Sequence, residues 1–255
     1  AASDVYKRQQ IENMENFKIA KDIDEEYYKN YLIAKKAGVN FLAYRCKINS
    51  KEIKIEKKLK IIMNSYSEKF EKMRIAGKLA AQTLDMLTEN IKEGISTAQI
   101  DKLGYEFIRD NGGYSAPLYY RGFTKSLCTS LNHVVCHGIP GERILEEGDI
   151  INVDVTAIVD GYYGDTSRMY SIGKISVKAQ NLIDATYESL MRSIKILKPG
   201  IKLGDIGNEI QTYVEAKGFS VVRDFCGHGI GDKFHEPPNV LHYGKKNTGV
   251  ELKPG

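Results

Sequence analysis

The hydrophobic pattern of Ile151–Tyr170 predicts two antiparallel strands joined by a tight turn, INVDVTAIV and YYGDTSRMY on either side of Asp160-Gly161. This dipeptide is preferred in two-residue type I′ hairpin turns. Because side chains alternate faces along a strand, the turn would place Thr156 opposite Asp165, with Asp154 two residues away on the same face. The hairpin therefore carries two acids on one face of a predicted sheet.

Two carboxylates this close, diagonal neighbours within roughly 8 Å, repel each other unless a proton or a cation lies between them. A pair of hard divalent metal ions would resolve the repulsion. The alternative is that Asp154 and Asp165 are solvated acids on an exposed face. The flanking apolar residues favour a buried sheet instead: Val153, Val155, Ile158 and Val159.

Helical periodicity replaces alternation on both sides of the hairpin. Apolar residues recur at helical spacing over 67–91, and Ser96-x-x-Gln99 is a capping box that begins a second helix, ending near Gly112-Gly113. Two further helices are predicted over 177–196 and 204–217. Residues 114–138 are predicted as strand and loop, and Ser220–Phe225 as a strand that leads into CGHGIG, Cys226–Gly231.

The first 62 residues have a different pattern. Glu25–Ala37 is predicted as a helix, Asn40–Cys46 as a buried strand, and the lysine-rich Lys47–Lys60 as an edge strand. Residues 10–62 are therefore predicted to form a short helix-strand-strand segment.

The chain contains an internal repeat, because Ile91–Gly112 aligns without gaps to Leu197–Gly218 at a spacing of 106 residues. Each copy follows a long predicted helix and precedes a predicted strand. This spacing is too long for a solenoid and indicates two related α/β halves about a pseudo-twofold axis, with the site between them. The alternative is a chance similarity between two amphipathic helices with glycine caps.

Composition adds bounds on the function. The chain has 255 residues, 42% of them hydrophobic and 27% charged, and a net charge of +4, too small to indicate a nucleic-acid coat. Four separated cysteines without a C-x-x-C pair indicate free thiols in a reducing compartment. The sequence shows neither a signal peptide nor an apolar run long enough to span a membrane. We therefore expect a cytoplasmic protein.

Histidines near the diacid hairpin extend the candidate site. His228 lies between glycines, which allow close approach of a ligand, and His235 follows seven residues later. His137 lies in VVCHGIP, and such imidazoles can donate to a developing oxyanion or a substrate amide. Cys136, beside it, could be a thiol nucleophile, but its apolar context favours an inert buried thiol.

Three motifs in this order, VVCHGIP, INVDVTAIVDGYYGDTSRM and CGHGIG, closely resemble type I methionine aminopeptidases, and the resemblance runs from about Glu68 to the last residue. It implies an α+β pita-bread fold, with two α-β halves around one curved antiparallel sheet. It also implies hydrolysis of the bond after an initiator methionine when the next residue is small. The family uses two divalent metal ions, with cobalt, manganese, iron or zinc as activating metals.

The resemblance assigns roles residue by residue. Asp154, Asp165 and His228 match metal ligands, and Thr156 matches a residue beside the metals. His137 matches the histidine that contacts the substrate amine side and assists the leaving group, and His235 matches the one that binds the scissile carbonyl. The positions that match the methionine pocket are Tyr120, Phe123, Cys128 and Phe234. An aromatic pocket suits a polarizable thioether.

Two features depart from the family. Its last two metal ligands are glutamates that follow a Leu-Lys-Pro-Gly segment, and this sequence ends at Leu252–Gly255, so we expect this truncated chain to be inactive or nearly so. Residues 10–62 instead resemble the C-terminus of the sugar fermentation stimulation protein family, which is associated with DNA binding. We interpret 1–9 as a non-native scar and 63–255 as the aminopeptidase domain lacking its last strands. Two joined reading frames, or alternatively a natural fusion, would produce this arrangement.

Three functions remain open. The chain is a fragment of a metalloaminopeptidase, a non-catalytic pita-bread binding module, or a DNA-associated protein through residues 10–62. The resemblance implies N-terminal methionyl peptides of nascent proteins as substrates, in the vicinity of the ribosome, and a monomer when the domain is complete. We expect no membrane partner, and nucleic-acid binding only weakly through residues 10–62.

Overall fold

The computed structural model describes residues 50–253, with side chains from residue 67 onward. The chain divides into two compact units, residues 1–65 and 66–255. The helix predicted over 25–37 and the strand predicted over 40–46 lie outside the described residues. Among those residues, no helix combines the length and the apolar character needed to cross a bilayer.

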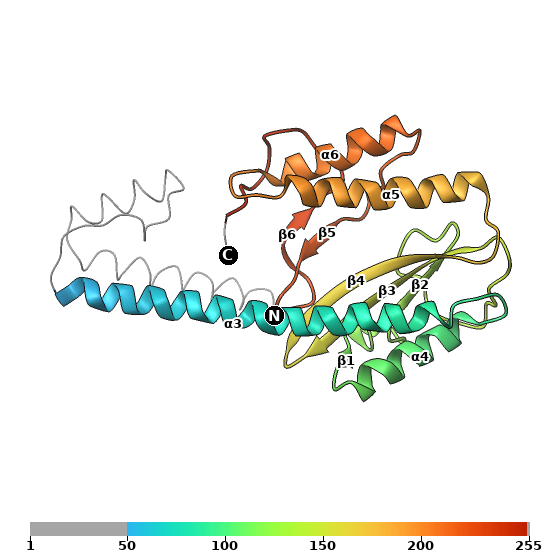
Figure 1. Cartoon of the computed structure of the whole chain (residues 1–255), viewed down its shortest axis with the longest axis horizontal. Helices are drawn as coiled ribbons and strands as arrows, with labels where there is room; N and C mark the ends of the chain where they lie inside the picture. Colours follow the sequence, from blue (N-terminus) through green and yellow to red (C-terminus); the bar gives the residue numbers. More distant parts are fainter. Residues whose placement is uncertain (1–49, 254–255) are drawn as a thin grey trace. The chain divides into compact units, whose positions relative to one another are not determined.

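The first half of the second unit is a four-stranded antiparallel sheet with two helices (Figure 1). Strand β3 lies at its centre and pairs with β4 on one side and with β1 and β2 on the other. The elements are α3 (Ser50–Thr88), α4 (Thr97–Asp110), β1 (Tyr114–Ser115), the 3-10 turn η2 (Tyr120–Gly122), β2 (Cys128–Leu131), β3 (Ile150–Val159) and β4 (Tyr162–Ser171).

The core lies between the two helices and one face of this sheet. Helix α3 contributes Leu84 and Leu87 and α4 contributes Ile100, all at most 2% exposed. They pack with Val153 and Val155 of β3, both fully buried. Because side chains alternate along β3, the residues between these valines lie on the opposite face. The core thus fixes which face of the hairpin carries the polar residues.

The second half contains α5 (Val177–Ile196), α6 (Leu203–Ala216), β5 (Gly227–Gly229) and β6 (Glu236–Val240). The two helices lie side by side, and β5 and β6 form a separate antiparallel pair next to them (Figure 1). The Tyr163 N–H of β4 donates to the Gly231 carbonyl over 3.0 Å. This bond connects the segment after β5 to the four-stranded sheet.

The internal repeat is present in the structure. Helices α4 and α6 begin and end 106 residues apart, as the sequence alignment predicts. The Gly94 N–H donates to Leu145, which donates in turn to the Ile95 carbonyl, both over 2.9 Å. Likewise Gly200 donates to Leu252 over 2.9 Å, and Leu252 donates to Ile201 over 2.7 Å. The two copies therefore share their hydrogen-bonding pattern as well as their helices.

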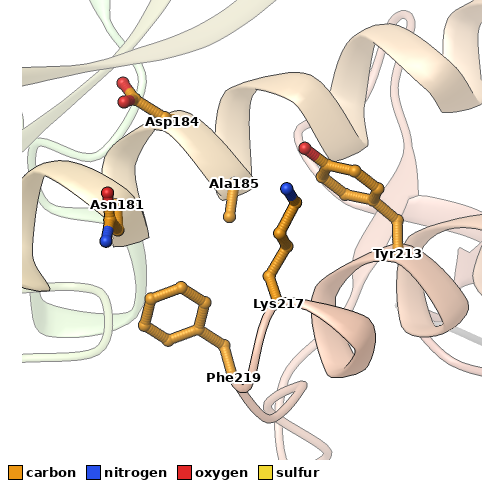
Figure 2. Close-up of a pocket in the computed structure, with 6 residues that line it drawn as sticks. All are labelled: Asn181, Asp184, Ala185, Tyr213, Lys217 and Phe219. Atoms are coloured by element: carbon orange, nitrogen blue, oxygen red, sulfur yellow. The ribbon is translucent and has the colours of Figure 1, made fainter.

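The halves differ in how tightly their helices pack. A groove of about 290 Å³ separates α5 from the end of α6, and Figure 2 shows the residues that line it: Asn181, Asp184, Ala185, Tyr213, Lys217 and Phe219. In the first half, Leu79 occupies the repeat position of Ala185, and its Cδ2 would lie 2.5 Å from a Cβ at Gly113. In the second copy Ala185 and Phe219 stand at the repeat positions of Leu79 and Gly113, so the large and small side chains are exchanged where the groove lies.

Each repeat helix begins with a different cap, which yields a stability prediction. Ser96 Oγ accepts the Gln99 N–H over 3.1 Å, and Gln99 Oε1 accepts the Ser96 N–H over 2.9 Å. At α6 the Asp205 carboxylate instead accepts the Lys202 N–H over 2.7 Å. We expect Ser96→Ala to cost about 1 kcal/mol, because it leaves the Gln99 N–H without its acceptor. Lys202→Ala, which keeps the Asp205 cap, is the control in thermal melts and should leave Tm unchanged.

Two elements differ from their prediction, whereas the α+β fold class is confirmed. The edge strand predicted over Lys47–Lys60 is wrong from Ser50 onward, because α3 begins there and continues to Thr88. Lysine, glutamate and leucine are strong helix formers, and they outweigh the alternation of isoleucines. Ser220–Phe225 is not a strand either: the pairing begins at Gly227, because no neighbouring strand pairs with 220–225 within the described residues.

Candidate active site

The acid hairpin has the predicted register. Thr156 pairs with Asp165 and Asp154 with Ser167 across β3 and β4. The turn residues Asp160 and Gly161 have φ angles of +48° and +80°, as a type I′ turn requires. Both acids and the buried Thr156 therefore lie on the face opposite the core.

Asp154 has a strongly perturbed carboxyl group. Burial, first, and the neighbouring charge of Asp165, second, together raise the pKa of Asp154 to about 7. Desolvation and like-charge repulsion both disfavour the ionised form. At neutral pH this pair therefore requires either a shared proton or a bound cation.

His228 of β5 completes the polar cluster. Its Nε2 lies 3.7 Å from Asp165 Oδ2, and its Nδ1 lies 3.0 Å from the Gly229 carbonyl oxygen. Because a carbonyl only accepts hydrogen bonds, this contact places the proton on Nδ1. The lone pair of Nε2 then faces Asp165. Two carboxylates and one such imidazole are the donors that a divalent transition metal prefers.

An aromatic cluster lies next to His228. The rings of His228 and His235 are 4.2 Å apart, and His235 Nδ1 lies 3.1 Å from the Tyr120 hydroxyl. Phe234 contacts Tyr120 with centroids 4.9 Å apart. Burial is the largest of the causes that lower the pKa of His235. Residues more than 100 positions apart in sequence thus form one wall beside the acids.

The aromatic cluster differs from the predicted pocket lining at two residues, Phe123 and Tyr163. Phe123 follows η2, and its carbonyl accepts the Tyr119 N–H over 2.7 Å, but the described residues include no ring contact between Phe123 and the aromatic cluster. Tyr163, which the sequence reasoning missed, stacks on Phe234 at 5.7 Å and 13°. Its position two residues before Asp165 on the same strand face was the available signal.

Cys128 lies directly opposite Asp154 in the sheet register. Burial, first, and the charge of Asp154, second, together raise the pKa of its thiol to about 12. Burial and Asp154 likewise raise the pKa of Cys136. A thiolate nucleophile is therefore disfavoured at both positions, as the inert-thiol interpretation of Cys136 expects. Cys136 is only partly buried, however, and the neighbouring Val134 and Val135 are exposed.

The Cys128 environment predicts slow thiol labelling. At pH 8 we expect iodoacetamide to modify Cys128 only after denaturation, because the folded thiol is both buried and protonated. Peptide mass mapping with and without guanidinium measures this. Labelling of Cys128 in the folded chain at the rate of a free cysteine would contradict the prediction.

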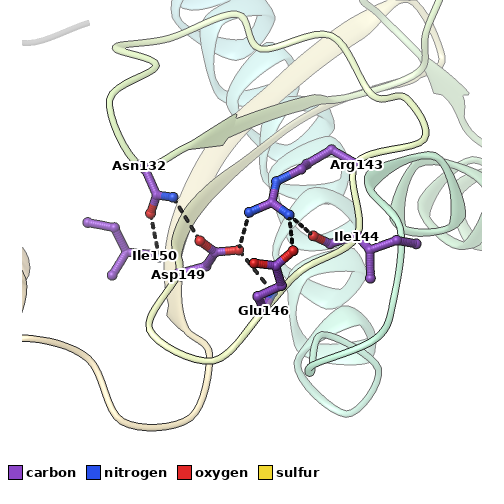
Figure 3. A network of polar contacts seen from close by, with 6 residues as sticks. All are labelled: Asn132, Arg143, Ile144, Glu146, Asp149 and Ile150. Carbon is purple, nitrogen blue, oxygen red and sulfur yellow. Dashed lines mark hydrogen bonds and ion pairs between the residues drawn. The ribbon is translucent and has the colours of Figure 1, made fainter.

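His137 lies in the loop after β2, with its ring 5.8 Å from that of Phe225 in a T-shaped contact. A polar network ties the base of this loop together, as Figure 3 shows. The buried Asp149 carboxylate accepts from Asn132 Nδ2 over 2.8 Å and from Arg143 Nη2 over 3.2 Å. Asn132 Oδ1 accepts the Ile150 N–H over 3.0 Å. The loop therefore leaves and rejoins the sheet at a fixed point.

The candidate metal ligands form only part of a coordination sphere. Asp154, Asp165 and His228 supply suitable chemistry, and the raised pKa of Asp154 indicates a site that gains stability from a cation. Within residues 67–253, however, no group of three or more His, Cys, Asp or Glu side chains is arranged to hold a metal ion. Water would have to fill the remaining coordination positions around ions at this site.

Comparisons with known proteins identify the families that the sequence matches. Residues 71–255 match metallopeptidase family M24, and residues 5–52 match the sugar fermentation stimulation protein RE domain. The methionine aminopeptidase of Rickettsia prowazekii is 53% identical over 186 residues, covering 73% of this chain and 72% of that protein. The Escherichia coli K12 enzyme is 50% identical over 190 residues, covering 74% and 72%.

A solved structure shows the same fold. The crystal structure of methionine aminopeptidase from Rickettsia prowazekii superposes with a TM-score of 0.73 at 52% sequence identity, covering 74% of this chain and 76% of that one. Family match, identity and fold agree over the same three quarters of the sequence. The chain therefore belongs to metallopeptidase family M24, in its methionine aminopeptidase branch.

Proposed function

We propose that this chain removes the N-terminal methionine from peptides, in a metal-dependent reaction at the Asp154–Asp165–His228 cluster. The observation that carries this proposal is the convergence of two carboxylates on one face of the sheet with an imidazole nitrogen 3.7 Å from one of them, beside an aromatic wall. Methionine aminopeptidases about half identical to it support the substrate class. Cobalt, manganese, iron and zinc are the metals to test.

The side chains have separate roles in this proposal. Asp154, Asp165 and His228 would hold divalent ions, which when bound supply an acidified water and polarise the peptide carbonyl. Tyr120 and Phe234 would receive the methionine side chain, because aromatic rings suit a thioether, and Cys128 would line the same pocket.

The other two histidines would handle the substrate's polar groups. His235, with its pKa lowered and its Nδ1 next to the Tyr120 hydroxyl, would remain neutral near pH 7 and could donate from Nε2 to the carbonyl. His137 would contact the leaving amine. Thr156, which is buried and directly opposite Asp165 in the sheet register, would orient Asp165.

Metal affinity is a separate proposal. Because residues 67–253 contain no group of three or more metal-binding side chains in metal-holding geometry, we expect the 255-residue polypeptide to bind divalent ions weakly. Turnover should then be slow and should require excess metal. Calorimetric titration with Mn²⁺ measures this, and tight, stoichiometric binding of two ions would contradict it.

The test of the function is methionine release by the full chain. We expect Met-Ala-Ser to lose its methionine in excess Co²⁺ or Mn²⁺, Met-Lys-Ser to resist, and EDTA or His228→Ala to stop the reaction. Binding of Met-Ala-Ser without cleavage at any metal concentration would instead identify a non-catalytic binding module. If the full chain neither binds nor cleaves Met-Ala-Ser, the proposal is overturned.

The finer cellular setting is proposed with it: a cytoplasmic monomer that acts on nascent chains near the ribosome. The match of residues 5–52 to the sugar fermentation stimulation protein RE domain favours one second candidate function, weak DNA association through residues 10–62. Binding of duplex DNA by the full chain should then fall steeply between about 50 and 200 mM salt. Binding that does not depend on salt would count against this candidate.

A further inference from the structure

We infer that Ser130 is a positioning residue for His137; the inference rests on the proposed function through the role given to His137. Ser130 lies on β2, 5% exposed, and its Oγ accepts the Gly138 N–H over 3.1 Å. That N–H belongs to the peptide group between His137 and Gly138. The hydrogen bond therefore fixes the orientation of the peptide unit that follows the histidine.

The backbone at this point needs such support. His137 has a φ of +55°, a left-handed conformation that non-glycine residues seldom adopt and that often marks functional sites. The Gly138 carbonyl accepts the Thr129 N–H over 2.8 Å. A Cβ at Gly138 would lie 2.1 Å from the Thr129 carbonyl oxygen, so only glycine fits this close to β2. The loop is thus held along the free edge of β2 at one residue.

The neighbouring hydroxyl groups of Thr129 and Ser130 lie on opposite faces of β2 and differ in their hydrogen bonding. Ser130 pairs with Asn152 and lies on the same face as Cys128 and Asp154. Thr129 lies on the opposite face, within the core, and its Oγ1 has no hydrogen-bond partner in the described part of the chain. The Ser130 hydroxyl accepts a hydrogen bond from the loop, whereas the Thr129 hydroxyl makes no hydrogen bond to it. The chain thereby offers a matched control.

The ring of His137 is held from a second direction, by the edge contact with Phe225 at 5.8 Å. Loss of the Ser130 hydrogen bond would leave the segment attached to β2 only through the Gly138 carbonyl, which accepts from Thr129, and would loosen the His137–Gly138 peptide. The edge contact with Phe225 would then be the remaining contact that orients the imidazole ring. A misplacement of the order of 1 Å at a reacting group can cost up to about 100-fold in rate. We therefore expect Ser130 to affect kcat more than KM.

The experiment compares Ser130→Ala, Ser130→Thr and Thr129→Val in the full chain. Ser130→Ala should accelerate amide exchange at Gly138 about tenfold, since one hydrogen bond is lost, and should weaken the ring-to-ring NOE between His137 and Phe225. With Met-Ala-Ser and excess Mn²⁺, kcat should fall about 10–100-fold with little change in KM. Ser130→Thr, which keeps the hydroxyl, and Thr129→Val should behave as the parent.

Unchanged exchange at Gly138 in Ser130→Ala would overturn the inference. Equal acceleration in Thr129→Val would also overturn it, because it would show general loosening of β2. The inference would also be overturned if Ser130→Ala accelerated amide exchange at Gly138 but left kcat unchanged. If the parent chain neither binds nor cleaves methionyl peptides, the proposed function fails, whereas the exchange and NOE results still decide whether Ser130 holds His137.

Discussion

The Asp154→Asn substitution is expected to remove metal binding while raising the stability of the metal-free chain above pH 7. In the folded chain, burial and Asp165 raise the pKa of Asp154 from 3.8 to about 7. Between these values the folded state binds more protons than the unfolded state, so stability falls as pH rises from about 4 to 7. Above pH 7 the ionised carboxylate costs a few kcal/mol. An amide avoids this cost but cannot replace a carboxylate ligand.

Thermal melts from pH 5 to 8, with EDTA or with excess Mn²⁺, test this expectation. The parent should lose stability toward pH 8 in EDTA and regain it with Mn²⁺, whereas Asp154→Asn should show little of either change. Asp160→Asn is the matched control, because it alters an acid of the same hairpin at its exposed turn, and Asn-Gly also favours a type I′ turn. Metal-induced stabilisation that survives in Asp154→Asn would exclude Asp154 as a ligand.

The hairpin could be predicted because its information is local. Alternation, an Asp-Gly turn and a register counted from that turn were sufficient to place Asp154 and Asp165 on one face. The repeat likewise required only alignment of the chain with itself. The roles of His228 and His235 came from resemblance, and the structure adds their close approach to each other, 4.2 Å between rings.

Other features depend on contacts that no local pattern encodes. The left-handed conformation of His137 follows from its loop lying against β2, with Ser130 and Thr129 as partners. The pairing of β5 with β6 includes a register shift between His228 and Gly229, which alternation alone does not predict. The strand predicted over 47–60 is wrong from Ser50 onward for a different reason: lysine-rich sequence with spaced isoleucines satisfies helix and strand patterns alike.

The second large effect is expected at Gly164, where α3 lies directly on β4. A Cβ at Gly164 would lie 2.1 Å from the Gly77 nitrogen and 2.3 Å from the Ala76 carbonyl carbon. These are backbone atoms of a helix, so they cannot move aside without lifting α3 from the core that contains Leu79 and Leu84. We therefore expect Gly164→Ala to destabilise the chain by about 3 kcal/mol or more, and to displace the adjacent Asp165.

The same contact supplies the control for this substitution. Gly77, on the helix side, has nothing within 4 Å of the position that a Cβ would occupy. Gly77→Ala should therefore stabilise the chain by about 1 kcal/mol, because glycine within a helix is less favourable than alanine by that amount. Urea unfolding at pH 7 measures both variants. If Gly164→Ala were as stable as the parent, α3 would not lie against β4 at this glycine, and the support beneath the acid hairpin would have to come from elsewhere.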